Sequence, residues 1–99
     1  RTVALMLANH NPRRLPPRAL GWDVKGETPG YTSCGDLMRR GALGHTGFTG
    51  TSLWFEPESG FTVIMLSNRV NLSRDKNQRD MIRFRPRLHN LVVTLFEGG

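Results

Sequence analysis

The stretch from residue 44 to residue 51, Gly-His-Thr-Gly-Phe-Thr-Gly-Thr, constrains the fold more than any other part of the sequence. Its three glycines are spaced three apart, and it leads directly into the apolar segment 52–55. Glycine adds no packing to a strand and costs conformational entropy, so such a strand makes sense where another group must approach the backbone closely. We therefore predict that residues 43–55 form a strand that serves as a binding or catalytic edge.

A second segment, residues 61–67, is apolar at nearly every position. A continuous run of this kind is typical of a strand that is covered on both faces. The residues between the two segments include Pro57 and Gly60, which are common in turns. We therefore predict an antiparallel hairpin formed by residues 43–55 and 61–67.

Weaker patterns predict the elements that precede this hairpin. Residues 2–9 indicate the end of a helix, because their apolar side chains recur at helical spacing. Residues 19–24 favour a short strand with alternating apolar side chains. Residues 25–40 are polar, rich in glycine and without periodicity, which predicts a surface loop that is longer than ordinary connections.

After the hairpin, residues 71–78 predict a polar loop, and an amphipathic helix follows with Pro86 in its first turn and Gly98-Gly99 at its end. Its apolar positions follow the helical pattern and are Leu88, Leu91, Val92, Leu95 and Phe96. Together these elements predict the α+β class, with antiparallel strands crossed by a C-terminal helix. The apolar content of 37% leaves little surface to cover the second face of residues 61–67, so we predict that a partner segment is missing.

The chain of 99 residues carries a formal charge of +6 and has a pI of about 11.1, which permits binding to nucleic acid or to an anionic membrane. Basic residues crowd the last third, but Phe84 is the aromatic residue among them and no recognition motif occurs. We interpret this region as a solvated basic loop and helix start, and we predict no nucleic-acid partner. No apolar run is long enough to span a membrane. Cys34 has no Lys or His beside it and is predicted to be structural.

The glycine-rich stretch carries groups that are suited to catalysis. A strand whose backbone is laid bare by Gly47 and Gly50 can pair with an extended substrate, and its N–H groups can point at a developing oxyanion. The hydroxyl of Thr46 can hold a carboxylate or a carbonyl. His45 can act as a general acid or base near physiological pH. A single histidine on a strand is more often structural, so both interpretations of His45 stay open.

The order of these segments resembles the C-terminal part of the serine β-lactamase-like hydrolases, the relatives of class C β-lactamases, penicillin-binding proteins and the esterases built on that fold. The resemblance rests on residues 44–55, the turn with Pro57, residues 63–70 with their Ser-Asn-Arg-Val ending, and residues 19–24 ahead of the motif. It covers nearly all of this chain but only the last part of the family's domain. It implies that residues 1–99 are an incomplete C-terminal segment of a β-lactamase/transpeptidase-like fold.

The resemblance also implies roles for four residues. The family's third motif, Lys-Thr-Gly or His-Thr-Gly, corresponds here to His45-Thr46-Gly47 and lines the active site, with His45 as the catalytic residue and the other two as substrate-binding residues. The residue after the glycine, which is Phe48 here, gives its backbone N–H to the oxyanion hole. Histidine in place of lysine removes a permanent charge, which favours esterase or peptidase-like specificity over binding of a penicillin-type carboxylate.

The family's nucleophile motif, Ser-x-x-Lys, and its Tyr-x-Asn element lie upstream of this region in relatives. Residues 73–76 do spell Ser-x-x-Lys, with Ser73 and Lys76, but they follow the hairpin in a predicted polar loop. We therefore interpret this match as a coincidence. An acyl-transfer site needs an activated nucleophile as well as an oxyanion hole. We expect the isolated chain to be inactive and to need a partner, either the N-terminal segment of the same fold or a second copy of the chain.

Two classes of function follow from the sequence. In the first, the chain contributes to hydrolysis of a small ester or amide substrate through an acyl-serine, without a cofactor or metal, and the resemblance favours a periplasmic or extracytoplasmic location. In the second, it is a non-catalytic remnant or interaction subunit that pairs through the edge of its sheet.

Overall fold

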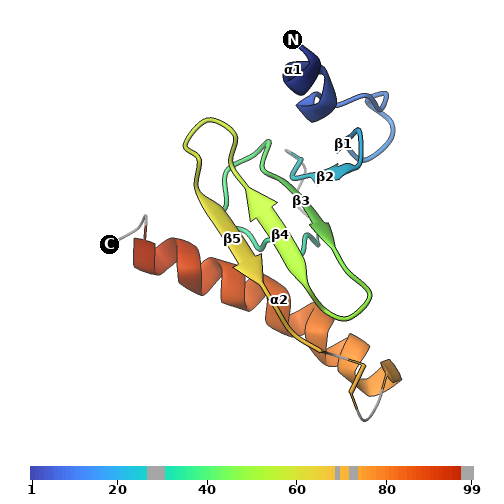
Figure 1. Ribbon diagram of the computed structural model, residues 1–99, viewed down its shortest axis with the longest axis vertical. Coiled ribbons are helices and arrows are strands. Elements are labelled where there is room, and N and C mark those ends of the chain that lie inside the picture. Colours follow the sequence, from blue (N-terminus) through green and yellow to red (C-terminus); the bar gives the residue numbers. More distant parts are fainter. Residues whose placement is uncertain (27–30, 69, 72–73, 97–99) are drawn as a thin grey trace.

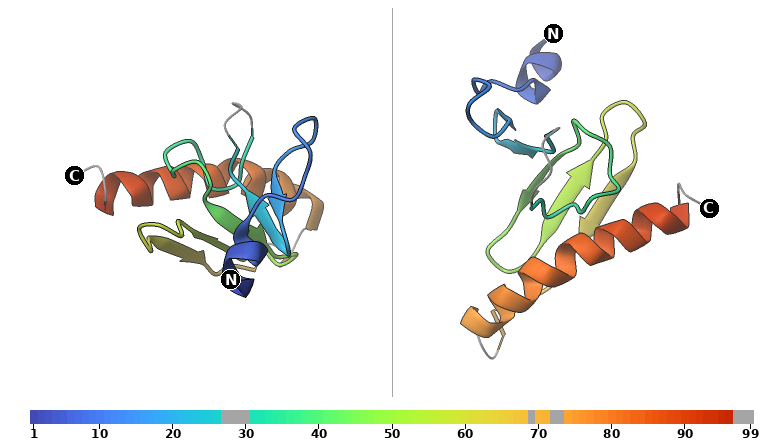
Figure 2. Two further views of the ribbon diagram at one scale, coloured as in Figure 1. Left: turned by 90° about the horizontal axis from the view of Figure 1, so that it is seen from above. Right: turned by 180° about the vertical axis from the view of Figure 1, so that it is seen from behind.

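Figure 1 shows the computed structural model, which describes residues 1–26, 31–68, 70–71 and 74–96. Five strands form one antiparallel sheet in the order β1-β2-β3-β4-β5, and a long helix crosses one face of this sheet. A short helix projects from the end at which the chain begins (Figure 2). The α+β class is therefore confirmed. The elements are α1 (Thr2–Leu7), β1 (Arg18–Ala19), β2 (Trp22–Val24), β3 (Leu43–Thr46), β4 (Ser52–Phe55), β5 (Thr62–Met65) and α2 (Arg74–Phe96).

The sequence predicts one strand over residues 19–24, but the structure has a tight hairpin there. Ala19 pairs with Trp22, and the turn between them includes Gly21 with φ of 78°. This left-handed conformation is open to glycine at little cost, so the chain reverses instead of continuing as a strand.

The predicted strand over residues 43–55 is also two strands, β3 and β4, joined by a turn. The Gly47 N–H donates to the Thr51 carbonyl at 2.7 Å, and the Gly50 N–H donates to the Gly47 carbonyl at 3.0 Å. Gly50 has φ of 97°, which favours glycine. The glycines at 47 and 50 therefore shape a turn, and the histidine and threonine of the motif end the strand that leads into it.

The strand β5 is not covered on both faces, contrary to the sequence prediction. Val63 and Met65 are buried, whereas the alternate residue Ile64 is 65% exposed and Leu66 beyond the strand is 81% exposed. Side chains alternate between the two faces of a strand, and only the face toward α2 is covered by described residues. Among the described strands, β5 pairs with β4 alone and so forms an edge of the sheet.

The helix α2 begins twelve residues before Pro86, within the segment that the sequence predicts to be a polar loop, and Pro86 lies inside it. A proline removes one helical hydrogen bond. The helix continues because Arg85, His89 and Val93, spaced four apart, are all buried, and most helical stability in proteins comes from such packing. The predicted end at Gly98-Gly99 lies outside the described residues.

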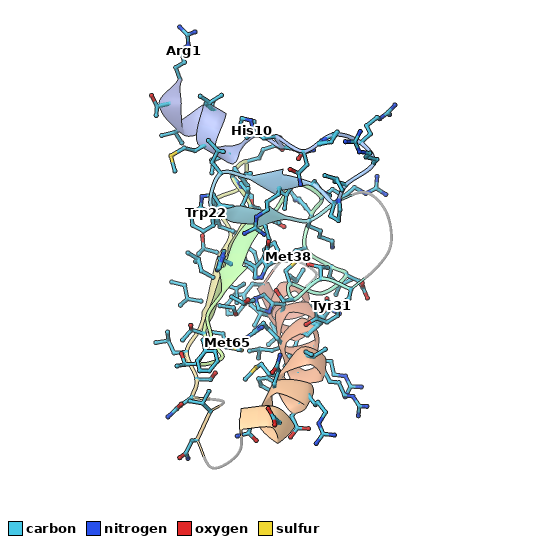
Figure 3. All side chains as sticks on the ribbon, turned by 90° about the vertical axis from the view of Figure 1, so that its right-hand side faces the viewer. Arg1, His10, Trp22, Tyr31, Met38 and Met65 are labelled. Atoms are coloured by element: carbon cyan, nitrogen blue, oxygen red, sulfur yellow. The ribbon has the colours of Figure 1, made fainter. Side chains whose placement is uncertain are left out.

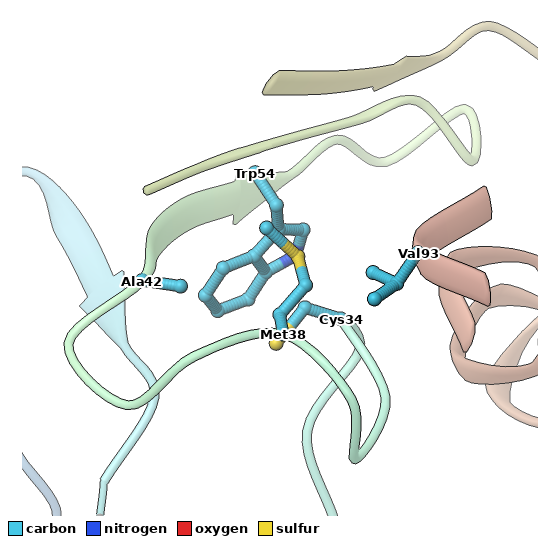
Figure 4. Close-up of a cluster of buried hydrophobic side chains, with 5 residues drawn as sticks. All are labelled: Cys34, Met38, Ala42, Trp54 and Val93. Carbon is cyan, nitrogen blue, oxygen red and sulfur yellow. The ribbon is translucent and has the colours of Figure 1, made fainter. Parts of the chain in front are cut away.

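The core lies between the sheet and α2, and it is closed by the 31–42 loop. Figure 3 views the sheet edge-on, with Tyr31 and Met38 of this loop on the same side as α2. The indole of Trp54 is 2% exposed and lies at the centre of the cluster in Figure 4. The loop that the sequence places at the surface therefore supplies part of the core. The clustered side chains are Cys34, Met38, Ala42, Trp54 and Val93.

Candidate active-site cleft

The strand β3 presents the His-Thr-Gly motif at its end, with its two side chains on opposite faces of the sheet. Thr46 pairs with Ser52 and is half-buried on the face toward α2, whereas His45 pairs with Leu53 and is exposed on the other face. The strand β2 pairs with β3 only at Leu43 and Gly44. Beyond Gly44, the outer edge of β3 is therefore not paired with any described strand.

Gly44 is required by the packing of β3 against the core. A Cβ atom at this position would overlap the indole ring of Trp54 and lie 2.6 Å from the Leu53 carbonyl oxygen. Because such contacts are far closer than van der Waals distance, no residue with a side chain fits without a shift of the strand. The first glycine of the motif thus lets the indole ring pack directly against the backbone of β3.

A cleft of about 430 Å³ opens where β2 leaves the edge of β3, and we call it the β3 cleft. Thr46 and Gly47 line it on one side, and Arg85 of α2 lines it on another. The cleft is therefore formed by parts of the chain that are far apart in sequence. The remaining lining residues are Pro16, Pro17, Asp23, Val24, Tyr31, Thr32, Ser33, Trp54, Gln78, Met81 and Ile82.

Arg85 joins α2 to the turn that follows β3. Its side chain is 7% exposed, and its Nη2 donates to the Gly50 carbonyl oxygen at 2.9 Å. The sequence assigns Arg85 to a solvated basic run, and the structure contradicts this assignment because the residue lies in the buried face of α2. Its spacing of four from His89 and eight from Val93 is the sequence signal that would have identified this face.

His89 lies one helical turn beyond Arg85 and is fully buried. Its Nδ1 donates to the Arg85 carbonyl oxygen at 2.8 Å, and its Nε2 has no hydrogen-bond partner among the described residues. Burial lowers the pKa of His89, and the charge of Arg85 acts in the same direction, against the opposing effect of the hydrogen bond to the Arg85 carbonyl. The lowered pKa favours the neutral form of the ring.

Residues 31–33 of the 31–42 loop line the β3 cleft, and α2 holds the loop in place. The Asn90 Oδ1 accepts hydrogen bonds from the backbone N–H of Asp36 at 2.9 Å and of Leu37 at 3.1 Å. Gly35 lies so close to Asn90 and to the Pro86 carbonyl that a Cβ atom there would overlap them. Because these contacts fix the loop against α2, the side chains at positions 31–33 are positioned over the cleft.

The loop also provides the hydrogen-bond acceptor for the buried indole N–H of Trp54. The Trp54 Nε1 donates to the Ser33 Oγ at 2.9 Å, and both groups are buried. Cys34, beside Ser33, is fully buried, and burial is the main cause that raises the pKa of its thiol. A buried thiol with a raised pKa is mostly protonated and unreactive.

The structure places the four predicted site residues close together, but only two of them line the β3 cleft. His45 donates from Nδ1 to the Thr46 carbonyl oxygen at 2.7 Å and points away from the cleft. Phe48 lies in the turn and is 58% exposed. Thr46 and Gly47 are in the lining. The roles of all four residues stay predictions, and Ser73 lies outside the described residues.

Two further observations concern metal ligands and membrane-spanning helices. Within residues 1–26, 31–68, 70–71 and 74–96, no group of three or more His, Cys, Asp or Glu side chains is placed to hold a metal ion. No helix in the described part of the chain has the length and apolarity needed to cross a lipid bilayer.

The five-stranded antiparallel sheet and its C-terminal helix form an α+β domain, which is consistent with a β-lactamase-like fold. A family model described as Beta-lactamase matches residues 2–85. The chain therefore belongs to the beta-lactamase family. It is also 40% identical, over 50 residues, to a protein of Escherichia coli (strain K12) named "Putative D-alanyl-D-alanine carboxypeptidase". That match covers 50% of this chain and 12% of the relative's length, and no solved structure matches.

Proposed function

We propose that this chain supplies one wall of the active site of a serine hydrolase, which cleaves a small ester or amide through an acyl-serine. The observation that carries the proposal is that Thr46 and Gly47 line the β3 cleft where the edge of β3 is no longer paired with β2. An exposed strand edge can hold an extended substrate by backbone hydrogen bonds. The family supports the reaction class, and the name of the E. coli relative is consistent with cleavage of an amide.

Within this proposal, each motif residue has a stated role. The Thr46 hydroxyl and the backbone of Gly47 hold the substrate, and the Phe48 backbone N–H stabilises the oxyanion of the tetrahedral intermediate. His45 exchanges protons with the reacting groups from the exposed face of β3. The nucleophile is a serine outside this chain, in an N-terminal segment of the same fold, and the 99 residues alone do not hydrolyse substrate.

The absence of activity in the isolated chain is directly testable. We expect no turnover of nitrocefin or of p-nitrophenyl esters above the rate in buffer. Turnover that is lost on Ser73→Ala would contradict the proposal, because Ser73 would then be the nucleophile and no second segment would be needed.

A fusion tests the role of the motif. The chain is joined behind the part of the E. coli relative that precedes its match, and acyl-enzyme formation with p-nitrophenyl acetate is followed by intact mass. Phe48→Pro removes the backbone N–H and is expected to lower the acylation rate about 10²–10³-fold, the usual effect of losing one oxyanion donor. Phe48→Ala keeps that N–H and is the matched control, with circular dichroism as the test of folding. Equal rates for Phe48→Pro and Phe48→Ala would refute the role of this N–H.

A second candidate function is a non-catalytic interaction subunit, and the strand β5 favours it. Its edge is not paired with a described strand beyond β4, and Ile64 and Leu66 are exposed beside it. Exposed apolar edge strands are sites of association with another chain. Size-exclusion chromatography with light scattering tests this function, because a folded monomer at all concentrations argues against pairing through β5.

A further inference from the structure

A second cleft, of about 840 Å³, adjoins the β3 cleft. We call it the arginine cleft. The 31–42 loop and the turn that precedes β1 form its walls. The two clefts share part of their lining, so a ligand that enters one can extend into the other. The shared residues are Pro16, Pro17, Val24, Tyr31 and Thr32.

The charge of the described residues that line the arginine cleft is strongly unbalanced. Its described lining has a single carboxylate, that of Asp36, against five cationic side chains. The ion pair found among the described residues, Arg18 with Asp23, joins residues outside this lining. The cationic residues are Arg13, Arg14, Lys25, Arg39 and Arg40.

Hydrogen bonds hold the wall that carries Arg39 and Arg40. The Arg39 backbone N–H donates to the Oε2 of the buried Glu56 at 2.9 Å. The Lys25 Nζ donates to the Asp36 carbonyl oxygen at 2.7 Å and also to the carbonyl oxygen of Met38. These bonds fix the backbone, while the guanidinium groups of Arg39 and Arg40 stay exposed.

The opposite wall, which carries Arg13 and Arg14, is held in a similar way. The Leu15 N–H donates to the Pro12 carbonyl at 3.0 Å, which closes a turn around the two arginines. The Asn11 Nδ2 donates to the Pro16 carbonyl at 2.7 Å, and this bond links the turn to the following prolines. Four of the positive charges therefore lie on two segments whose backbones are held by hydrogen bonds, the turn before β1 and the 31–42 loop.

The chemistry of these side chains defines the ligand. A guanidinium group binds a carboxylate or a phosphate through two parallel hydrogen bonds. Cationic groups that face one another repel, and a bound anion removes that repulsion. We propose that the arginine cleft is an anion subsite that takes the acidic end of an extended ligand, one with two or more neighbouring carboxylate or phosphate groups. In naming this ligand as part of the substrate, the inference rests on the proposed function.

Calorimetric binding of simple anions to the 99-residue chain tests the subsite without any acyl transfer. Citrate and tripolyphosphate are compared with acetate at low salt. Both multivalent anions are expected to bind more tightly than acetate, and the tighter of the two shows whether the acidic end carries carboxylates or phosphates. Binding of neither beyond the level of acetate overturns the inference, whatever the outcome of the fusion experiment.

Three variants distinguish anion binding in the arginine cleft from a general effect of the net positive charge of the chain. Arg39→Gln with Arg40→Gln is expected to weaken binding about tenfold, the upper range for two exposed ion pairs. Arg83→Gln with Arg87→Gln changes the charge equally on the exposed face of α2, outside both clefts, and should weaken binding less than about twofold. Asp36→Asn should strengthen binding about threefold, a gain that misfolding does not produce. Equal losses in the two double variants, or no gain in Asp36→Asn, would overturn the inference.

Discussion

Replacement of Asn90 tests whether α2 positions the 31–42 loop, and with it one wall of the β3 cleft. The Asn90 Oδ1 accepts two backbone hydrogen bonds, from Asp36 and Leu37. A hydrogen bond contributes about 0.5–1.5 kcal/mol net to stability. Asp36 and Leu37 are exposed, so water can replace the lost acceptor and the lower half of this range applies. Asn90→Leu is therefore expected to lower the free energy of unfolding by about 1–2 kcal/mol.

The assay is urea unfolding of the full chain, followed by tryptophan fluorescence. A loss of this size corresponds to a fall in Tm of roughly 4–16 °C for a domain of about 100 residues. Leucine has a higher helix propensity than asparagine, so the measured loss understates the contribution of the hydrogen bonds. Asn90→Asp is the matched control, because its carboxylate keeps an acceptor oxygen in place and should cost about 0.5 kcal/mol or less.

Two results would refute this reasoning. If Asn90→Leu were as stable as the parent chain, the hydrogen bonds would contribute nothing to the docking of the loop. If Asn90→Asp lost as much as Asn90→Leu, the loss would come from some property of the side chain other than its acceptor oxygen.

Three further predictions concern the core. Gly44→Ala should lower the free energy of unfolding by about 1–3 kcal/mol, because the new methyl group overlaps Trp54, and the cost should shrink in a Trp54→Leu background. The pKa of His89 is lowered in the folded chain, so the unfolded chain binds more protons between that pKa and about 6.5. Stability should therefore be full above this range and decrease as pH falls through it, and His89→Gln should reduce the slope seen in urea midpoints. The buried Cys34 should react with a thiol reagent only as fast as the chain opens, so reaction in buffer as rapid as in urea would contradict the raised pKa of this thiol.

The sequence predicts the class of this fold because its apolar segments are long enough for the pattern of a strand or of a helix to be recognised. The antiparallel arrangement of the strands and the presence of a C-terminal helix are both confirmed. The strand boundaries are wrong where a left-handed glycine reverses the chain, at Gly21 and Gly50. A glycine in a sequence is compatible with either a strand or a turn, and the choice depends on which backbone groups are near enough to accept hydrogen bonds.

The errors at β5 and α2 have a different physical origin. An unbroken apolar segment predicts a strand that is covered on both faces. Whether the face that carries Ile64 is covered depends on atoms outside residues 61–67. The position of Pro86 favours a helix that starts there, whereas α2 begins at Arg74 and runs through Pro86 with Arg85 and His89 buried on either side of it. Periodicity read from apolar residues misses a buried face that is formed by an arginine and a histidine.

The opposite orientations of His45 and Thr46 limit how the motif can act. Of these two side chains, that of Thr46 lines the β3 cleft and that of His45 does not, because side chains alternate along a strand. A substrate that entered the cleft as a compact ligand would meet Thr46 and Gly47 but not His45. A substrate that paired with the free edge of β3 would lie in the plane of the sheet and pass both side chains. The combined use of His45 and Thr46 would therefore require an extended substrate along that edge, and its acidic end would lie in the arginine cleft that we propose as an anion subsite.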